Sequence, residues 1–222
     1  MRITIRQLRT LIKESMQTVS PVPEPDCKSF AVFDFDETLA LTKSEILVVD
    51  DHGKKIRSLT PAQFAMYIPA ADEKFDFSEF DIVKDGKPTV LMDVLHDMVA
   101  CGADSAAILT ARGPKSEGSI RSFLADMGIK LQIIDTLGSA EPQKKALKIK
   151  GYVMSYRPEF LHFFEDSPGN LLAVKKMAET DREFERVTVI LHKMVAGNKA
   201  GVEQVEYIGP KSTSAVEDSN FS

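Results

Sequence analysis

The segment Phe30-Ala31-Val32-Phe33-Asp34-Phe35-Asp36-Glu37-Thr38 decides the fold class of this chain. It is a nearly continuous apolar run that closes with carboxylates. Such a run is typical of a strand buried on both faces, as in a parallel sheet. Two residues apart in a strand, Asp34 and Asp36 would share a face. Because the strand ends here, we expect Asp36 to turn out into the crevice at the edge of the sheet.

Apolar strand patterns and helix patterns alternate along the rest of the chain. This alternation indicates an α/β fold with a doubly wound, Rossmann-like parallel sheet in a three-layer sandwich. Right-handed crossovers would then bring all strand C-termini to one edge, where such folds place their sites. The sequence predicts further strands at 106–109, 131–134, 161–164 and 187–191, and helices at 88–101, 115–127, 144–150 and from 170 to 177.

Three segments lie outside this alternation. Residues 40–87 predict a small cap insertion over the active edge, with a hairpin turning near Gly53 and a short helix starting at Thr60. Residues 1–26 predict a basic amphipathic helix followed by a proline-rich linker. That helix either docks on the domain or a neighbouring subunit, or binds a partner protein through residues 1–20. The α/β core is expected at 27–201, and a flexible tail at 202–222.

Composition sets limits on the class of protein. The chain has 222 residues, a hydrophobic fraction of 43% and a net charge of −5. It contains no apolar run of the ~18–20 residues that span a bilayer, and its N-terminus does not resemble a secretory signal. Cys27 and Cys101 are interpreted as plain thiols in a reducing compartment, which predicts a cytoplasmic protein. The charge argues against a dedicated non-specific nucleic-acid binder, but a nucleotide or nucleic-acid end stays open as a substrate.

The carboxylates Asp34 and Asp36 predict a metal site and a nucleophile. Two acids this close do not readily both ionise without a counter-charge, and hard oxygen ligands suit Mg²⁺. Asp34 could attack phosphorus to form an aspartyl-phosphate. Asp36 could protonate the leaving group and later activate water. The alternative interpretation is a surface turn that carries two acids.

A second polar motif, Thr110-Ala111-Arg112, closes the predicted strand at 106–109. The Thr110 hydroxyl and the N–H of Ala111 could hold a phosphoryl oxygen, and Arg112 could clamp the substrate. The alternative is a strand end whose threonine caps a helix.

Two further motifs complete the predicted constellation. A lysine of the 144–148 segment could pair with Asp34, although solvated lysines are the default for a helix face. The Glu165-Asp166 pair follows the predicted strand at 161–164, with Asp166 as the expected metal ligand beside Asp34 and Asp36. Asn170 could orient Asp166. The alternative is that Asp166 or Ser167 caps the helix that follows.

These motifs resemble those of the haloacid dehalogenase-like (HAD) superfamily, in its phosphatase branch. Phe33-Asp34-Phe35-Asp36-Glu37-Thr38-Leu39 looks like the first motif, Leu109-Thr110-Ala111-Arg112 the second and Glu165-Asp166-Ser167-Pro168-Gly169-Asn170 the fourth. The resemblance implies Asp34 as nucleophile, Asp36 as acid and base, Thr110 as a phosphate ligand and Lys145 as the third-motif lysine, with Lys148 second. It places Thr38, Ala111 and Arg112 at the substrate. Asn170 stands where the family often has a second acid.

The resemblance implies a Mg²⁺-dependent phosphomonoesterase that acts through an aspartyl-phosphate. A small cap favours exposed phosphates, such as those of nucleotides or polynucleotide ends. The residues of these motifs are also similar to those of HAD proteins encoded by large tailed phages. This resemblance implies the host cytoplasm or a virion as the location. The alternative functions are a HAD-fold structural or virion-associated binding protein with a targeting N-terminal helix, and phosphotransfer to an acceptor other than water.

Overall fold

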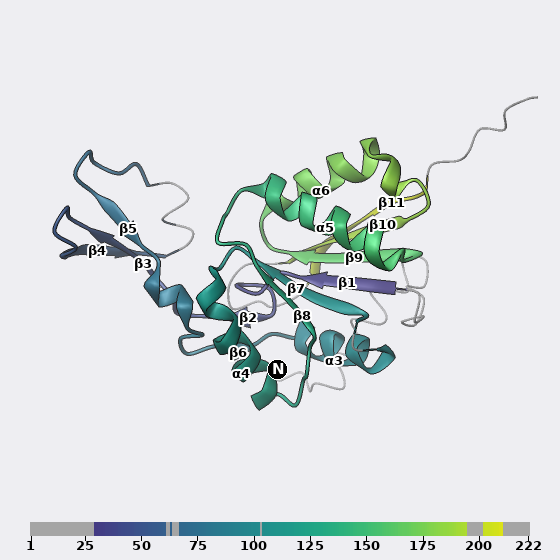
Figure 1. Cartoon of the computed structure of the whole chain (residues 1–222), viewed down its shortest axis with the longest axis horizontal. Helices are drawn as coiled ribbons and strands as arrows, with labels where there is room; N and C mark the ends of the chain where they lie inside the picture. Colours follow the sequence, from purple (N-terminus) through teal and green to yellow (C-terminus); the bar gives the residue numbers. More distant parts are fainter. Residues whose placement is uncertain (1–28, 61–62, 64–66, 103, 195–201, 211–222) are drawn as a thin grey trace, which may run out of the picture.

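A six-stranded sheet forms the centre of the computed structural model, which describes residues 29–60, 63, 67–102, 104–194 and 202–210. The spatial order of its strands is β11-β10-β9-β1-β7-β8 (Figure 1). Neighbours from β10 to β8 pair in parallel, whereas β11 pairs antiparallel with β10. The sheet contains β1 (Ser29–Phe33), β7 (Ala106–Thr110), β8 (Ile133–Thr136), β9 (Phe160–Glu165), β10 (Thr188–Met194) and β11 (Val202–Ile208). The predicted α/β fold with a mostly parallel sheet is confirmed.

The first strand lies in the middle of the sheet. From β1 the chain moves outward to β7 and β8 on one side, and then returns to β9 and β10 on the other side. The direction of winding therefore reverses between β1 and β9. In open α/β sheets, ligands bind outside the carboxyl ends of the strands at such a switch point.

Helices cover both faces of the sheet (Figure 1). One face packs against α3 (Leu91–Cys101) and α4 (Glu117–Asp126), and the other against α5 (Pro142–Tyr156) and α6 (Pro168–Thr180). Three short 3-10 helices complete the described helical structure: η1 (Ser78–Asp81), η2 (Pro114–Ser116) and η3 (Arg182–Phe184). None of the described helices is long and apolar enough to cross a membrane.

Strand β1 contributes to two hydrophobic cores at once. Ala31 and Phe33 belong to the core beneath α3 and α4, whereas Phe30 and Val32 belong to the core beneath α5 and α6. Each of these side chains is buried. Because both faces of the strand are covered, its sequence is a continuous apolar run and does not alternate with polar residues.

The predicted cap insertion forms its own small sheet. A two-stranded ladder of β2 (Ala40–Leu41) and β6 (Lys87–Pro88) joins it to the core. Beyond the ladder lies a three-stranded antiparallel sheet, which extends outward from the carboxyl-edge side of the main sheet (Figure 1). Its strands are β3 (Ile46–Val49), β4 (Lys55–Leu59) and β5 (Lys74–Asp76). The hairpin expected around Gly53 is confirmed, and Gly53 has a φ of 78° in its turn.

Several predicted boundaries differ from the structure. Helix α5 continues through Gly151 to Tyr156, whereas the pattern predicted an end at residue 150. Strand β8 starts two residues later than expected. The expected flexible tail begins instead with β11, an edge strand paired with β10. The predicted helix and linker at 1–26 lie outside the described residues, as does most of the helix expected after Thr60.

A substitution at Leu95 tests the core beneath α3. Leu95 has 0% of its surface exposed, whereas the adjacent Val94 is 36% exposed. We expect Leu95→Ala to lower the free energy of unfolding by about 2–5 kcal/mol, because it leaves a cavity in a packed core. Val94→Ala is the control on the same helix, with an expected change within about 0.5 kcal/mol. Denaturant titration measures both, and equal effects would contradict the described packing.

Candidate active site

Three carboxylates meet at the switch point of the sheet. Asp34 directly follows β1, Glu165 ends β9, and Asp166 is the next residue. One oxygen from each of the three lies within 4.8 Å of the others. Because β1 and β9 are adjacent and parallel, their carboxyl ends bring these acids together from positions far apart in the sequence. The predicted association of Asp34 with Asp166 is therefore present in the structure.

Lys145 joins two of these carboxylates from α5. Its Nζ lies 2.6 Å from Asp34 Oδ1 and 2.7 Å from Glu165 Oε2, and its side chain is 3% exposed. The neighbouring lysines point elsewhere: Lys148 pairs with Asp135 at 2.8 Å, and Lys144 with Glu141 at 3.0 Å. Among the three candidates named from the sequence, the structure therefore places Lys145 beside Asp34.

The charges of this cluster do not balance. Three carboxylates and one ammonium carry a net charge of −2 when all are ionised. Burial raises the pKa of Asp34 well above its ordinary value, and Glu165, Asp166 and Asp36 raise it further against the effect of Lys145. Burial and Glu165 likewise raise the pKa of Asp166 from 3.8 to about 7. Burial alone would lower the pKa of Lys145, but Asp34 and Glu165 raise it overall.

The carboxylate group fits a hard divalent cation. Carboxylate oxygens are the ligands that Mg²⁺ prefers, and a charge of +2 would offset the excess negative charge. The residues that could hold the ion are Asp34, Glu165 and Asp166. The side chain of Asp36, also expected as a ligand, lies outside this group. Glu165, which the sequence placed behind Asp166, belongs to it and also accepts a hydrogen bond from the backbone N–H of Ser167 at 3.1 Å.

Asp36 points toward the cap and not toward the three carboxylates. Arg112 donates two parallel hydrogen bonds to the Asp36 carboxylate, from Nε to Oδ2 at 2.8 Å and from Nη2 to Oδ1 at 2.7 Å. The hydroxyl of Thr42, on the segment that enters the cap, donates to Oδ1 at 2.8 Å. The structure therefore places Arg112 against Asp36, where the sequence had suggested a clamp on the substrate. No local sequence pattern linked these residues, which are 76 positions apart.

The remaining residues expected at the substrate differ in exposure. Thr110 ends β7 and is buried, with its Oγ1 accepting a hydrogen bond from the N–H of Arg112 at 3.3 Å. Ala111 is half-buried beside it. Thr38 is completely buried, and within the described residues its Oγ1 has no hydrogen-bond partner. Thr110 and Ala111 thus stand next to the carboxyl edge as predicted, whereas Thr38 lies inside the loop that follows β1.

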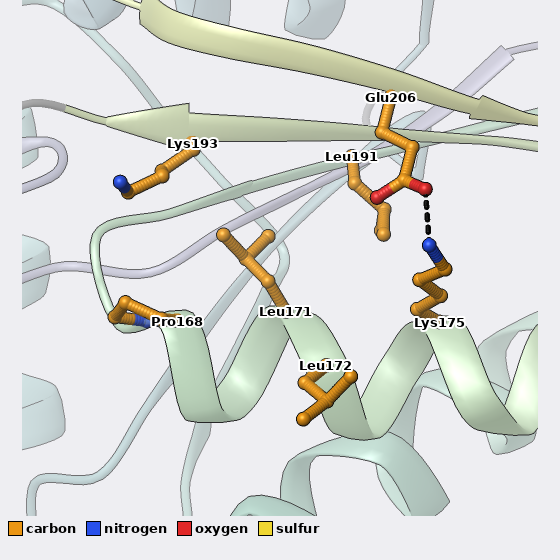
Figure 2. Close-up of a pocket in the computed structure, with 7 residues that line it drawn as sticks. All are labelled: Pro168, Leu171, Leu172, Lys175, Leu191, Lys193 and Glu206. Carbon is orange, nitrogen blue, oxygen red and sulfur yellow. Dashed lines mark hydrogen bonds and ion pairs between the residues drawn. The ribbon is translucent and has the colours of Figure 1, made fainter.

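A shallow groove of about 270 Å³ lies between α6 and the strands β10 and β11 (Figure 2). Its lining is mainly apolar, and Lys175 forms an ion pair with Glu206 across it. None of the described residues expected to do chemistry lines this groove. The lining residues are Pro168, Leu171, Leu172, Lys175, Leu191, Lys193 and Glu206.

The raised pKa of Asp166 predicts how metal-free stability depends on pH. The folded pKa of about 7 lies above the ordinary 3.8, so the folded state binds this proton more tightly than the unfolded state. The resulting stability is present below the unfolded pKa and is lost as the pH rises through about 7. We therefore expect the melting temperature of metal-free protein to fall between pH 5 and pH 8.

Added Mg²⁺ should reverse that fall. At about 100 times its dissociation constant the ion adds about 2.7 kcal/mol at pH 8, because it binds only the folded state. Asp166→Asn is the matched variant: it should reduce the pH dependence, to which Asp34 also contributes, and abolish stabilisation by Mg²⁺. Thermal melts with EDTA, Mg²⁺ or K⁺ measure the effect. Equal stabilisation of parent and variant would place the ion elsewhere.

Comparison of the chain with protein-family models, with curated proteins and with solved structures gives no match. What the site can do is therefore inferred from its own residues. These are the three carboxylates, of which Asp34 and Glu165 are buried and Asp166 is half-buried, the lysine beside Asp34 and Glu165, and the separate pair that Asp36 makes with Arg112.

Proposed function

We propose that this chain is a Mg²⁺-dependent phosphohydrolase of the HAD superfamily, which cleaves phosphomonoesters through an aspartyl-phosphate on Asp34. The observation that supports this most is the carboxylate group at the switch point, with Lys145 buried between Asp34 and Glu165. Lys145 orients the Asp34 carboxylate and supplies positive charge next to the place where a phosphoryl group would be transferred.

The first chemical step is attack by Asp34. A carboxylate oxygen of Asp34 forms a bond to phosphorus while the bond between phosphorus and the ester oxygen breaks. The leaving oxygen takes a proton, which Asp36 supplies from its carboxyl group. Lys145 offsets the negative charge of the transferring group, and the Thr110 end of β7 offers a hydroxyl and the N–H of Ala111 to its oxygens.

The second step returns the enzyme to its starting state. Asp36, now ionised, accepts a proton from water as the water oxygen attacks phosphorus. The bond between phosphorus and Asp34 breaks, inorganic phosphate leaves, and both carboxyl groups regain their starting protonation. An acceptor alcohol in place of water would give phosphotransfer with the same residues. Hydrolysis and phosphotransfer therefore differ only in the molecule that accepts the phosphoryl group.

When bound, Mg²⁺ would supply positive charge that offsets the carboxylates and the phosphoryl oxygens. The residues that would hold it are Asp34, Asp166 and Glu165, whose ligand atoms lie close together. A buried nucleophile must be ionised to attack, and its pKa is raised here by burial and by neighbouring acids. We therefore expect the reaction to require a metal ion, whose positive charge would favour the ionised form of Asp34.

Phosphates of nucleotides or polynucleotide ends are the proposed substrates. The described part of the cap contains one small sheet and the two connections to the core, and it extends outward from the edge where the carboxylates lie (Figure 1). A small cap suits a phosphate that is presented at the end of a larger molecule. A panel of nucleotides, oligonucleotides with 5′- or 3′-phosphate ends, sugar phosphates and phosphopeptides would decide the class.

Replacement of Asp34 tests the nucleophile. Asp34→Asn should lower turnover of 4-nitrophenyl phosphate in Mg²⁺ by at least about a thousandfold, because the amide is a poor nucleophile. Asp135→Asn, at the end of the parallel strand β8 but outside the cluster, is the control and should stay near the parental rate. Acid quenching followed by mass spectrometry should find phosphate on the parental peptide that contains Asp34. Full activity of Asp34→Asn would refute this mechanism.

A pair of lysine variants tests the third assignment. Lys145→Met should lower kcat by about a hundredfold or more, because it removes the charge beside the transferring group. Lys148→Met removes a lysine of the same helix that pairs with Asp135 and should have little effect. Circular dichroism verifies that both variants fold. If Lys148→Met proves the more damaging of the two, the geometry described for Lys145 does not carry the reaction.

A further inference from the structure

The guanidinium of Arg112 is the most heavily bonded side chain near the site. Besides its two bonds to Asp36, Nη1 donates to the carbonyl oxygens of Phe80 at 2.8 Å and Ile82 at 2.7 Å. Nη2 also donates to Thr42 Oγ1 and Ser44 Oγ, both at 3.3 Å. An arginine has five N–H donors, and all three nitrogens are engaged with protein acceptors. The side chain is 1% exposed.

These acceptors belong to both connections of the cap. Thr42 and Ser44 follow β2, where the chain enters the cap, and Phe80 and Ile82 lie in and after η1, where the chain leaves it. The aromatic contacts repeat this arrangement. The guanidinium carbon lies 5.4 Å from the ring centre of Phe35 in the core and 5.1 Å from that of Phe80 in the cap.

The same guanidinium determines where the Asp36 carboxylate points. Both oxygens of Asp36 accept hydrogen bonds from Arg112, and Thr42 adds one more to Oδ1. Both carboxylate oxygens are therefore occupied by N–H donors of one planar guanidinium. To protonate a leaving group, the Asp36 carboxyl group must first turn from this position toward the substrate.

We propose that Arg112 is a positioning residue that couples the placement of the cap to the availability of Asp36 for proton transfer. The inference rests on the proposed function, which gives Asp36 its proton-transfer role. When the cap connections move, the carbonyl and hydroxyl acceptors that hold the guanidinium move with them. The guanidinium of Arg112, with its fork of N–H donors, then shifts and turns the Asp36 carboxyl group toward the substrate. With the connections in the positions seen here, Asp36 stays withdrawn.

This coupling gives the cap an effect on catalysis that needs no contact with the substrate. Arg112 would act only through Asp36, so its loss should affect the steps that need a proton. Glycerol 2-phosphate has an alkoxide leaving group that requires protonation, whereas 4-nitrophenyl phosphate releases a stable phenolate. The two substrates therefore separate an effect on Asp36 from an effect on phosphate binding.

The kinetic test compares Arg112→Lys with the parent in the first turnover. Lysine keeps the charge but loses the planar fork. We expect release of glycerol from glycerol 2-phosphate to slow by about tenfold or more, because lysine lacks the fork that turns Asp36 toward the substrate when the cap connections move. Release of 4-nitrophenolate should change far less. KM should change little. When Asp36→Asn is already present, adding Arg112→Lys should cause no further loss, because the two residues act as one unit.

Arg57→Lys is the matched control. Arg57 also lies in the cap, where it contacts the ring of Tyr67 and pairs with Glu73. It should leave both rates unchanged. The proposal is overturned if Arg112→Lys slows both substrates equally, if its effect multiplies with that of Asp36→Asn, or if KM rises while kcat is retained, which would indicate a clamp on the substrate.

Hydrogen exchange provides a test without turnover. Because coupling is reciprocal, Asp36→Asn as well as Arg112→Lys should speed exchange of backbone amides at residues 42–44 and 80–84. Asp34→Asn should not, since Asp34 belongs to the other cluster. If the parent hydrolyses no phosphomonoester, the proposed function fails, and unchanged exchange in Asp36→Asn separately shows that Asp36 and the cap are not linked.

Discussion

The buried ion pair of Lys145 with Asp34 and Glu165 is the constraint on which the rest of the structure depends. An ammonium or a carboxylate removed from water is costly unless a partner of opposite charge and good geometry meets it. Here the partners come from three separate elements: the end of β1, the end of β9 and the first turn of α5. The ion pair therefore fixes where α5 begins relative to the two central strands. The winding of the sheet brings those strands side by side, so fold and site impose the same geometry.

Asp34 and Asp36 reduce their mutual repulsion because their side chains point in opposite directions. Asp34 turns inward to Lys145, and Asp36 turns outward to Arg112. Each acid thus meets its own buried cation, although the two are only two residues apart. One pair lies at the centre of the sheet, whereas the other reaches both connections of the cap. The division suits a site in which the nucleophile stays fixed and the acid responds to movement of the cap.

The sequence predicted the parts of this arrangement that depend on local pattern. A strand buried on both faces, such as β1, has an apolar run that is visible without a structure, and polar residues that end such strands share one edge. Local sequence patterns failed where contacts with distant segments determine the structure. The segment of β11 was hidden by the polar composition of 202–222 as a whole, and it gains its hydrogen bonds from β10. Helix α5 continues through Gly151 because its apolar face is packed against the sheet. The bidentate hydrogen bonding of Arg112 to Asp36 joins residues 76 positions apart, so no local spacing predicts it.

Glu165 shows how the same limit acts inside the site. In the sequence it stands next to Asp166, which was the residue of the pair expected to be the ligand. The structure gives both a place in the carboxylate group, with Glu165 also bound to Lys145. One lysine is then shared between two acids, and the third acid has no cation of its own among these residues. The cluster consequently retains negative charge in the place where the proposed nucleophile must be ionised. A divalent ion would remove that conflict, so on the proposed function metal binding and activation of Asp34 are one property of the site.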